Sequence, residues 1–212
     1  MNPLLIIGPD STLSDAYDLA KEIWSDRKIE KFHIPSTDYY NFDLSGLDKF
    51  LPEEWEISIV VNEFYINDVR RALQNIIATM GYTFNSLISP KAHVSSSASI
   101  GKNAIIHAGC FIGANSKIGD YCVLRPNVVL SEDVHVGNFS TFEANVTIRE
   151  ISKIGNFVTI CANSNLQRGS KVGDHCYLNI SQQYSGEISP CTFFSPVFSE
   201  KIQVLGYFSE NQ

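Results

Sequence analysis

Hydrophobic positions recur every six residues, without an insertion, from residue 86 to residue 181. Sixteen consecutive hexads keep this register, and their third position is always Ile, Val, Leu or Phe. Their first position is always Ala, Ser, Cys or Val, so a small and a large side chain alternate inward from each short strand. This hexapeptide pattern is the signature of a parallel β-helix.

Glycines recur eighteen residues apart in the same region, each after Ile or Val. They are Gly101, Gly119, Gly137, Gly155 and Gly173. Three hexads therefore form one triangular coil, and equivalent residues of stacked coils lie about 4.8 Å apart, as neighbouring strands do. We expect these glycines at a corner where the backbone needs a positive φ.

The first 82 residues follow another pattern, in which strands alternate with helices. Apolar runs predict strands at LLIIG (residues 4–8), KFHI (31–34) and EISIVV (56–61). Apolar residues at helical spacing predict helices over residues 13–24 and 66–80, the second ended by Gly81. This order is typical of a small α/β unit with a parallel sheet. The fold class is thus α/β plus all-β, with domains at residues 1–82 and 83–212.

Composition limits the classes of function. Sixteen basic and twenty-three acidic residues, without a long run of either sign, disfavour nucleic acid as a partner and indicate no membrane-binding patch. We expect no transmembrane helix and no signal peptide. The five cysteines are odd in number and have no C-x-x-C spacing, which argues against a disulfide framework and a zinc site and favours a cytoplasmic location. Cys110, Cys122 and Cys176 occupy small inward positions and are interpreted as structural.

Outward residues eighteen apart form columns on the faces of the β-helix. One column contains Lys117, His135, Lys153 and Lys171, and it is either a solvated face or a binding row for a phosphate-bearing ligand. Another column is apolar and contains Leu87, Ile105 and Val123. Beside it, Phe111 and Val129 point outward from a different face. We expect the N-terminal domain or neighbouring subunits to cover these apolar residues.

The segment MGYTFNSLISPKAHVSSSASIGKNAIIHAGCFIG, residues 80–113, resembles the sialic acid O-acetyltransferases and the bacterial sugar N-acetyltransferases that act on nucleotide-activated amino sugars. The resemblance extends over nearly the whole chain. It implies a small Rossmann-like N-terminal domain, a left-handed β-helix and a homotrimer. It further implies acetyl-CoA in grooves between neighbouring β-helices and a nucleotide-linked sugar held largely by the N-terminal domain.

The resemblance also implies a catalytic base, a histidine followed by an acidic residue, on a corner of the β-helix. In SEDVHVG, residues 131–137, Glu132 stands where that histidine belongs, and Asp133 matches its acidic neighbour. Glu150 lies eighteen residues further on, and two carboxylates one strand spacing apart raise one another's proton affinity. Glu132, helped by Asp133 and Glu150, is therefore the candidate base, with a solvated corner as the alternative.

The turn after the first strand departs from the family as well. The family's turn is rich in glycine, whereas this chain has GPDS at residues 8–11. Gly8, Asp10 and Ser11 are the candidate substrate-binding residues. Pro9 removes an amide donor, and Asp10 adds a negative charge where a phosphate would lie.

The other histidines suggest less chemistry. His107 shares a column with Arg125, Glu143 and Cys161, where an Arg125–Glu143 pair is the plain interpretation and a His107 base is the alternative. The histidines are too far apart in the repeat to supply the three ligands of a catalytic zinc site, so we expect no metal.

Two functional hypotheses follow from these observations. The first is an acetyl-CoA-dependent acyltransferase that modifies an amino or hydroxy group of a nucleotide-linked sugar in bacterial surface-glycan biosynthesis, with Glu132 replacing the usual histidine. The second is a non-catalytic relative, a trimer that binds a ligand or partner without acyl transfer. From residue 182 the hexad pattern ends, and an irregular last coil with a cap is expected.

Overall fold

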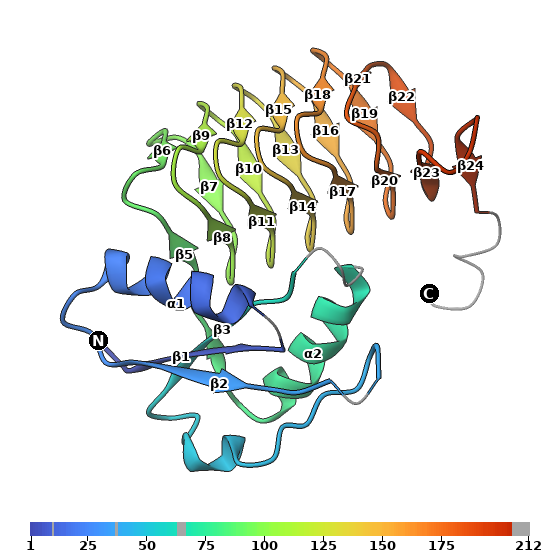
Figure 1. Ribbon diagram of the computed structural model, residues 1–212. Coiled ribbons are helices and arrows are strands. Elements are labelled where there is room, and N and C mark those ends of the chain that lie inside the picture. The colour runs from blue at the N-terminus through green and yellow to red at the C-terminus, as the bar shows by residue number, and fades with distance from the viewer. Residues whose placement is uncertain (10, 37, 63–66, 205–212) are drawn as a thin grey trace.

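The N-terminal part of the protein is a four-stranded sheet with two helices, seen at the bottom of Figure 1. A computed structural model describes residues 1–9, 11–36, 38–62 and 67–204. The strands are β1 (Leu4–Gly8), β2 (Ile29–His33), β3 (Glu56–Ile59) and β4 (Thr83–Phe84), in the order β2-β1-β3-β4, and all pairs are parallel. The predicted parallel sheet is confirmed. Its Rossmann-like character and the boundary at residue 82 stay predictions.

Two amphipathic helices flank this sheet. They are α1 (Thr12–Ile23) and α2 (Asn67–Thr79), within one or two residues of the predicted bounds. Leu13, Ala16, Leu19 and Ala20 of α1 are buried, and their spacing of three or four residues places them on one face of the helix. The burial of this apolar stripe, more than intrinsic propensity, explains why the segment is helical.

Residues 87–203 form a β-solenoid of strands of two or three residues, stacked as a row of coils in Figure 1, in which all pairs are parallel except β23–β24. Three sheets run along it. The first, the covered face, contains β5 (Leu87–Ile88), β8 (Ile105–Ile106), β11 (Val123–Leu124), β14 (Thr141–Phe142), β17 (Thr159–Ile160), β20 (Tyr177–Leu178), β23 (Thr192–Phe194) and β24 (Ile202–Gln203). The second, the apolar face, contains β6 (His93–Val94), β9 (Phe111–Ile112), β12 (Val129–Leu130), β15 (Thr147–Ile148), β18 (Asn165–Leu166) and β21 (Gln183–Tyr184). The third, the basic face, contains β7 (Ser99–Ile100), β10 (Lys117–Ile118), β13 (His135–Val136), β16 (Lys153–Ile154), β19 (Lys171–Val172) and β22 (Glu187–Ile188).

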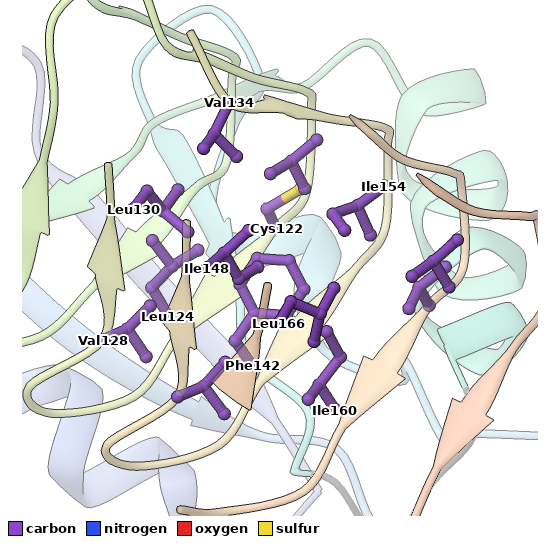
Figure 2. Packing of buried hydrophobic residues seen from close by; sticks show 14 of the residues in the cluster. Cys122, Leu124, Val128, Leu130, Val134, Phe142, Ile148, Ile154, Ile160 and Leu166 are labelled. Atoms are coloured by element: carbon purple, nitrogen blue, oxygen red, sulfur yellow. The ribbon is translucent and has the colours of Figure 1, made fainter. Parts of the chain in front are cut away.

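The hexad register accounts for the core of the solenoid. Figure 2 shows the buried side chains, with Phe142 surrounded by aliphatic residues of neighbouring coils. Cys110, Cys122 and Cys176 are at most 1% exposed, as their small inward positions predict. Burial raises the pKa of each of these thiols to about 11, so none is a ready nucleophile near neutral pH.

The recurring corner glycines have a different cause from the one predicted. Gly137 has no positive φ, and a Cβ atom on it would lie 2.6 Å from the carbonyl carbon of Gly155 in the next coil. The positive φ occurs two residues later, at Phe139, where it is 57°. These glycines are required because the backbones of stacked coils approach each other closely. The expectation of a positive φ at the glycines was wrong.

The N-terminal domain covers one face of the solenoid, as the apolar column predicted. Leu87, Ile105 and Val123 are buried in one cluster with residues of α1 and β1. Figure 1 shows α1 running beside β5 and β8. The predicted cover over this column is confirmed, and the N-terminal domain of the same chain provides it.

Helix α2 forms a second contact with the solenoid. Below it, Tyr121, Phe139, Phe157 and His175 stack on one another at one corner, with ring centroids 4.8, 5.1 and 4.6 Å apart. Arg70 of α2 is buried beside this stack. The N-terminal domain is thus attached to the solenoid along two helices.

The apolar face has no comparable cover in the part of the chain that the structure describes. The Phe111 side chain is 41% exposed and stacks on His93, with ring centroids 4.9 Å apart. The C-terminal segment completes a last coil through β21, β22 and β23, and Phe194 packs edge-on against Tyr184. This packing supports the predicted cap.

Candidate active site

The candidate base Glu132 lies on the corner between the apolar and basic faces, which we call the second corner. The chain turns there between β12 and β13, and Asp133 adopts a φ of 58°. The Asp133 N–H donates a hydrogen bond to the carbonyl oxygen of Ala114 in the preceding coil, at 2.9 Å. The Glu132 carbonyl accepts one from the Ile151 N–H of the next coil, at 3.1 Å. The corner is therefore fixed by its backbone, which leaves both carboxylates to face solvent.

Both carboxylates of this turn are exposed. Among the described residues, neither Glu132 nor Asp133 has a side-chain hydrogen bond or an ion pair. Glu150 follows on the same corner one coil later, and its Oε2 lies 3.5 Å from Nε of Arg149. That Oε2 atom is shielded from solvent and accepts no hydrogen bond from the described residues. The second corner thus carries three acidic side chains, one of them incompletely satisfied.

A row of basic residues begins beside this corner. Lys117, His135, Lys153 and Lys171 occupy paired positions on successive strands of the basic face, and all four side chains are exposed. Glu187 ends the row, with its carboxylate 3.8 Å from Nζ of Lys171. The predicted column is confirmed as a geometric feature. Its role in binding phosphate stays a prediction.

The turn after β1 begins with a glycine that packing requires. A Cβ atom on Gly8 would lie 2.4 Å from the carbonyl oxygen of Val60. Ser11 is the exposed N-cap residue of α1, and its side chain forms no capping hydrogen bond. The positive end of the helix dipole at a helix start suits an anionic ligand. Asp10, the third candidate of this turn, lies outside the described residues.

A small cleft lies where α1 meets the corner between the covered and apolar faces, which we call the first corner. Its lining includes Thr12, Asp15, Val60, His107 and Arg125. An Nη atom of Arg125 lies 3.2 Å from Oδ2 of Asp15 and 3.4 Å from Nε2 of His107. The separation between His107 Nε2 and Asp15 Oδ2 is 3.8 Å. A nearly buried imidazole is therefore held between two opposite charges at the edge of the turn after β1.

Comparisons with known proteins agree with this architecture. Residues 115–150 match the family model described as bacterial transferase hexapeptide (six repeats). Among curated proteins, none matches the sequence. The acetyltransferase domain of PglB from Neisseria gonorrhoeae is 21% identical, with 92% of this chain and 98% of that chain covered and a TM-score of 0.78. A structure of that domain in complex with acetyl coenzyme A has a TM-score of 0.79 at 19% identity, with 91% of this chain and 95% of that chain covered.

A third similar structure is PerB from Caulobacter crescentus in complex with CoA and GDP-perosamine. It is 18% identical, with 92% of this chain and 96% of that chain covered and a TM-score of 0.54. The fold is that of bacterial hexapeptide-repeat acetyltransferases. The resemblance inferred from the sequence is confirmed at this level, while its sialic acid O-acetyltransferase branch stays a prediction.

The structure brings together only part of the predicted site. The second corner and the cationic row adjoin, whereas the turn after β1 lies beside the first corner, on the other side of the apolar face. Asp15 was missed because its partners come from another domain. The spacing of eighteen residues between His107 and Arg125 was the available signal for that pair.

Two further observations concern other classes of function. In the ranges that the structure describes, no group of three or more His, Cys, Asp or Glu side chains is placed to hold a metal ion. Neither described helix has the length and apolarity needed to cross a membrane.

Proposed function

We propose that this protein is an acetyl-CoA-dependent acyltransferase that acts on an amino or hydroxy group of a nucleotide-linked sugar in bacterial surface-glycan biosynthesis. The observation that carries this proposal is the fold likeness over both domains. The PglB domain and PerB match more than nine tenths of this chain, and those structures contain acetyl-CoA or CoA with GDP-perosamine. The protein works as a cytoplasmic homotrimer, with a left-handed solenoid and a Rossmann-like N-terminal domain.

The basic face suits the donor. CoA carries several phosphates, and lysine ammonium groups are point-charge partners for phosphate. His135, Lys153 and Lys171 lie in one row beside the second corner. CoA bound along this row directs its thioester toward Glu132 and Asp133.

The N-terminal turn suits the acceptor. Ser11 is the N-cap residue of α1 and Gly8 precedes it in the same turn, and the positive end of the helix dipole favours the diphosphate of a nucleotide. Pro9 lacks an N–H group and Asp10 carries a negative charge, so both weaken the attraction of this turn for a phosphate. Hydroxyl contacts therefore hold part of the sugar-nucleotide.

The chemistry requires a proton acceptor for the attacking amine or hydroxyl, and such a group contributes about 10²–10⁴-fold to the rate. Glu132 occupies the place of the base in this proposal, with Asp133 and Glu150 beside it. Its carboxylate accepts the proton while the acceptor atom attacks the thioester carbonyl carbon and CoA leaves.

Calorimetric titration with acetyl-CoA and with CoA tests the donor without a guess about the acceptor. Saturable binding supports the proposal. We expect the K153A/K171A variant to bind CoA roughly tenfold more weakly, because charge-assisted contacts to phosphate are lost. K102A is the matched control, since Lys102 is an exposed lysine on another corner, and it should bind CoA as the wild type does. Absence of binding at millimolar CoA would contradict the proposal.

One observation favours the second hypothesis, a trimer without acyl transfer. Glu132 is exposed and has no side-chain partner among the described residues, which is an unusual environment for a general base. CoA binding without CoA release in the presence of a panel of nucleotide-linked amino sugars would support that alternative.

A further inference from the structure

We infer, on the basis of the proposed function, that Ile151 and Gly169 on the second corner bind the pantetheine arm of the CoA donor. The Ile151 side chain is the apolar contact, and Gly169 leaves it accessible. This contact places the thioester beside Glu132, and it adds a binding element that neither the lysines of the basic face nor the carboxylates of the corner supply.

Ile151 breaks the residue pattern of its own corner. Four successive coils have a residue with positive φ at this position: Asn115 (59°), Asp133 (58°), Ile151 (55°) and Gly169 (71°). Asparagine, aspartate and glycine adopt this conformation most readily, whereas a β-branched side chain is crowded by its own backbone there. Among the described residues, Ile151 is the only β-branched residue with a positive φ. Its backbone is therefore strained.

Packing within the chain does not offset this strain. The Ile151 side chain is 49% exposed, and it belongs to none of the hydrophobic clusters formed by the described residues. By contrast, Phe139 and Phe157 also have a positive φ, but their rings stack on each other with centroids 5.1 Å apart. Backbone strain without internal compensation is typical of functional sites. An exposed isoleucine in this conformation thus indicates a contact with a ligand.

Gly169 leaves one side of Ile151 uncovered. It occupies the same corner position one coil later, where its N–H donates a hydrogen bond to the carbonyl oxygen of Glu150 at 2.9 Å. A Cβ atom on Gly169 would lie 3.9 Å from Cδ1 of Ile151, which is contact distance. A side chain at position 169 would therefore lie against the isoleucine. With glycine there, the isoleucine can pack against an extended ligand that passes over the backbone.

The charges around Ile151 select the part of the donor that fits. The three carboxylates of the second corner repel phosphate. Lys153 follows Ile151 by two residues, and Lys171 follows Gly169 by two, so the groups that attract phosphate lie next to the corner on the basic face. A donor with its phosphates on these lysines must reach the corner with an uncharged segment.

The pantetheine arm of CoA has this chemistry. It is uncharged, it carries methylene and methyl groups between its amides, and it joins the phosphates to the thioester. Corner positions 169, 151 and 133 span two coil steps, about 10 Å, with Ile151 in the middle. The Ile151 N–H donates a hydrogen bond to the Glu132 carbonyl oxygen at 3.1 Å. An arm packed on Ile151 therefore brings the thioester to the candidate base.

Calorimetric titration of I151N tests this contact. Asparagine accommodates the positive φ and removes the apolar side chain. We expect acetyl-CoA to bind I151N about fivefold more weakly than the wild type, because the partial burial of an isoleucine side chain is lost. Adenosine 3′,5′-bisphosphate, which has the phosphates of that end of CoA but no pantetheine arm, should bind both proteins equally. Equal weakening of both ligands would overturn the assignment to the arm.

Thermal unfolding separates this role from a structural one. I151N should unfold about 3 °C above the wild type, because the strain of a β-branched residue is relieved. Weaker binding together with higher stability excludes a folding defect. A lower unfolding temperature for I151N would show that the side chain supports the coil, and it would overturn the role in binding.

Two further variants complete the test. I76N is the matched control, since Ile76 is 47% exposed on α2, and it should bind acetyl-CoA as the wild type does. G169N keeps a residue that tolerates the positive φ but covers Ile151, so it should also weaken acetyl-CoA binding. Unchanged affinity in I151N and G169N would overturn the inference and leave the proposed function intact. A wild type that binds no acetyl-CoA would overturn both.

Discussion

The two contacts between the N-terminal domain and the solenoid differ in character. Under α2, Arg70 is 3% exposed and donates hydrogen bonds to the Asn67 side chain at 2.6 Å, the Thr141 hydroxyl at 2.8 Å and the Phe139 carbonyl at 3.0 Å. Under α1, the polar groups surround a cleft, and Asp15 is 55% exposed at its edge. The α2 contact thus contains a buried, hydrogen-bonded arginine, whereas the α1 contact has charged groups at an open edge beside its buried apolar cluster.

This difference indicates that one contact attaches the N-terminal domain to the solenoid and the other serves ligand binding. The α2 contact holds the domain in place through buried groups, whose partners are costly to remove. The α1 contact can then present His107, Arg125 and Thr12 to a ligand without having to provide most of the stability. We therefore expect substitutions under α2 to act on folding and substitutions under α1 to act on binding and catalysis.

The largest effect on stability is expected from R70M. The substitution removes the shared donor of the Asn67, Thr141 and Phe139 oxygen atoms, although Asn67 Oδ1 keeps a hydrogen bond from the Thr141 hydroxyl. The loss of these buried hydrogen bonds costs about 3 kcal/mol in total. Urea unfolding measures the change. R71M is the matched control, because Arg71 is half-exposed and contacts the Asp68 carboxylate and the Phe157 ring. It should cost less than about 1 kcal/mol. Equal losses in both variants would show that the buried hydrogen bonds of Arg70 do not account for the stability of the α2 contact.

A smaller loss of folding stability is expected at alkaline pH. Burial raises the pKa of the Cys122 thiol to about 11, and burial also raises the pKa of the neighbouring Tyr121 phenol. Both groups favour their neutral form in the folded state. The contribution of Cys122 to stability is complete below pH 9 and is lost as pH rises toward 11, and that of Tyr121 is lost only above pH 10. For Cys122 the loss reaches roughly 2 kcal/mol.

Urea unfolding between pH 8 and pH 11 measures this dependence. The C122A variant is expected to be less stable than the wild type below pH 9 and to lose less stability above pH 9, whereas S96A, at an exposed position, should follow the wild type. A slope for C122A as steep as that of the wild type would show that the thiol does not couple folding to pH.

The solenoid could be predicted from the sequence almost residue by residue, because its contacts repeat at a fixed interval. The period of eighteen correctly placed Lys117, His135, Lys153 and Lys171 in one column and predicted the apolar column that α1 covers. The period did not reveal the physical reason why position 137 must be a glycine. A repeat reports which residues stack, but the crowding between backbones that requires glycine appears only in the folded structure.

The candidate site was predictable only where it lies within one repeat. Glu132, Asp133 and Glu150 were placed on one corner, as expected from their spacing. The cluster of Asp15, His107 and Arg125 was not found as a unit, because a helical residue and two corner residues of another domain share no period. Contacts between elements with different periodicities depend on how the domains dock, and that information is not local in the sequence.

The smallest effect on stability is expected at the open contact, from D15N. Asp15 forms an ion pair with Arg125 at 3.2 Å while its own side chain is more than half exposed, and such pairs contribute about 0.5 kcal/mol. D18N, on an exposed position of the same helix, is the matched control. Urea unfolding at low and high salt should show a small loss for D15N at low salt that disappears at high salt, since exposed pairs are screened. A loss of several kcal/mol at both salt concentrations would mean that the α1 contact is closed like the α2 contact, and that His107 is held as a structural group.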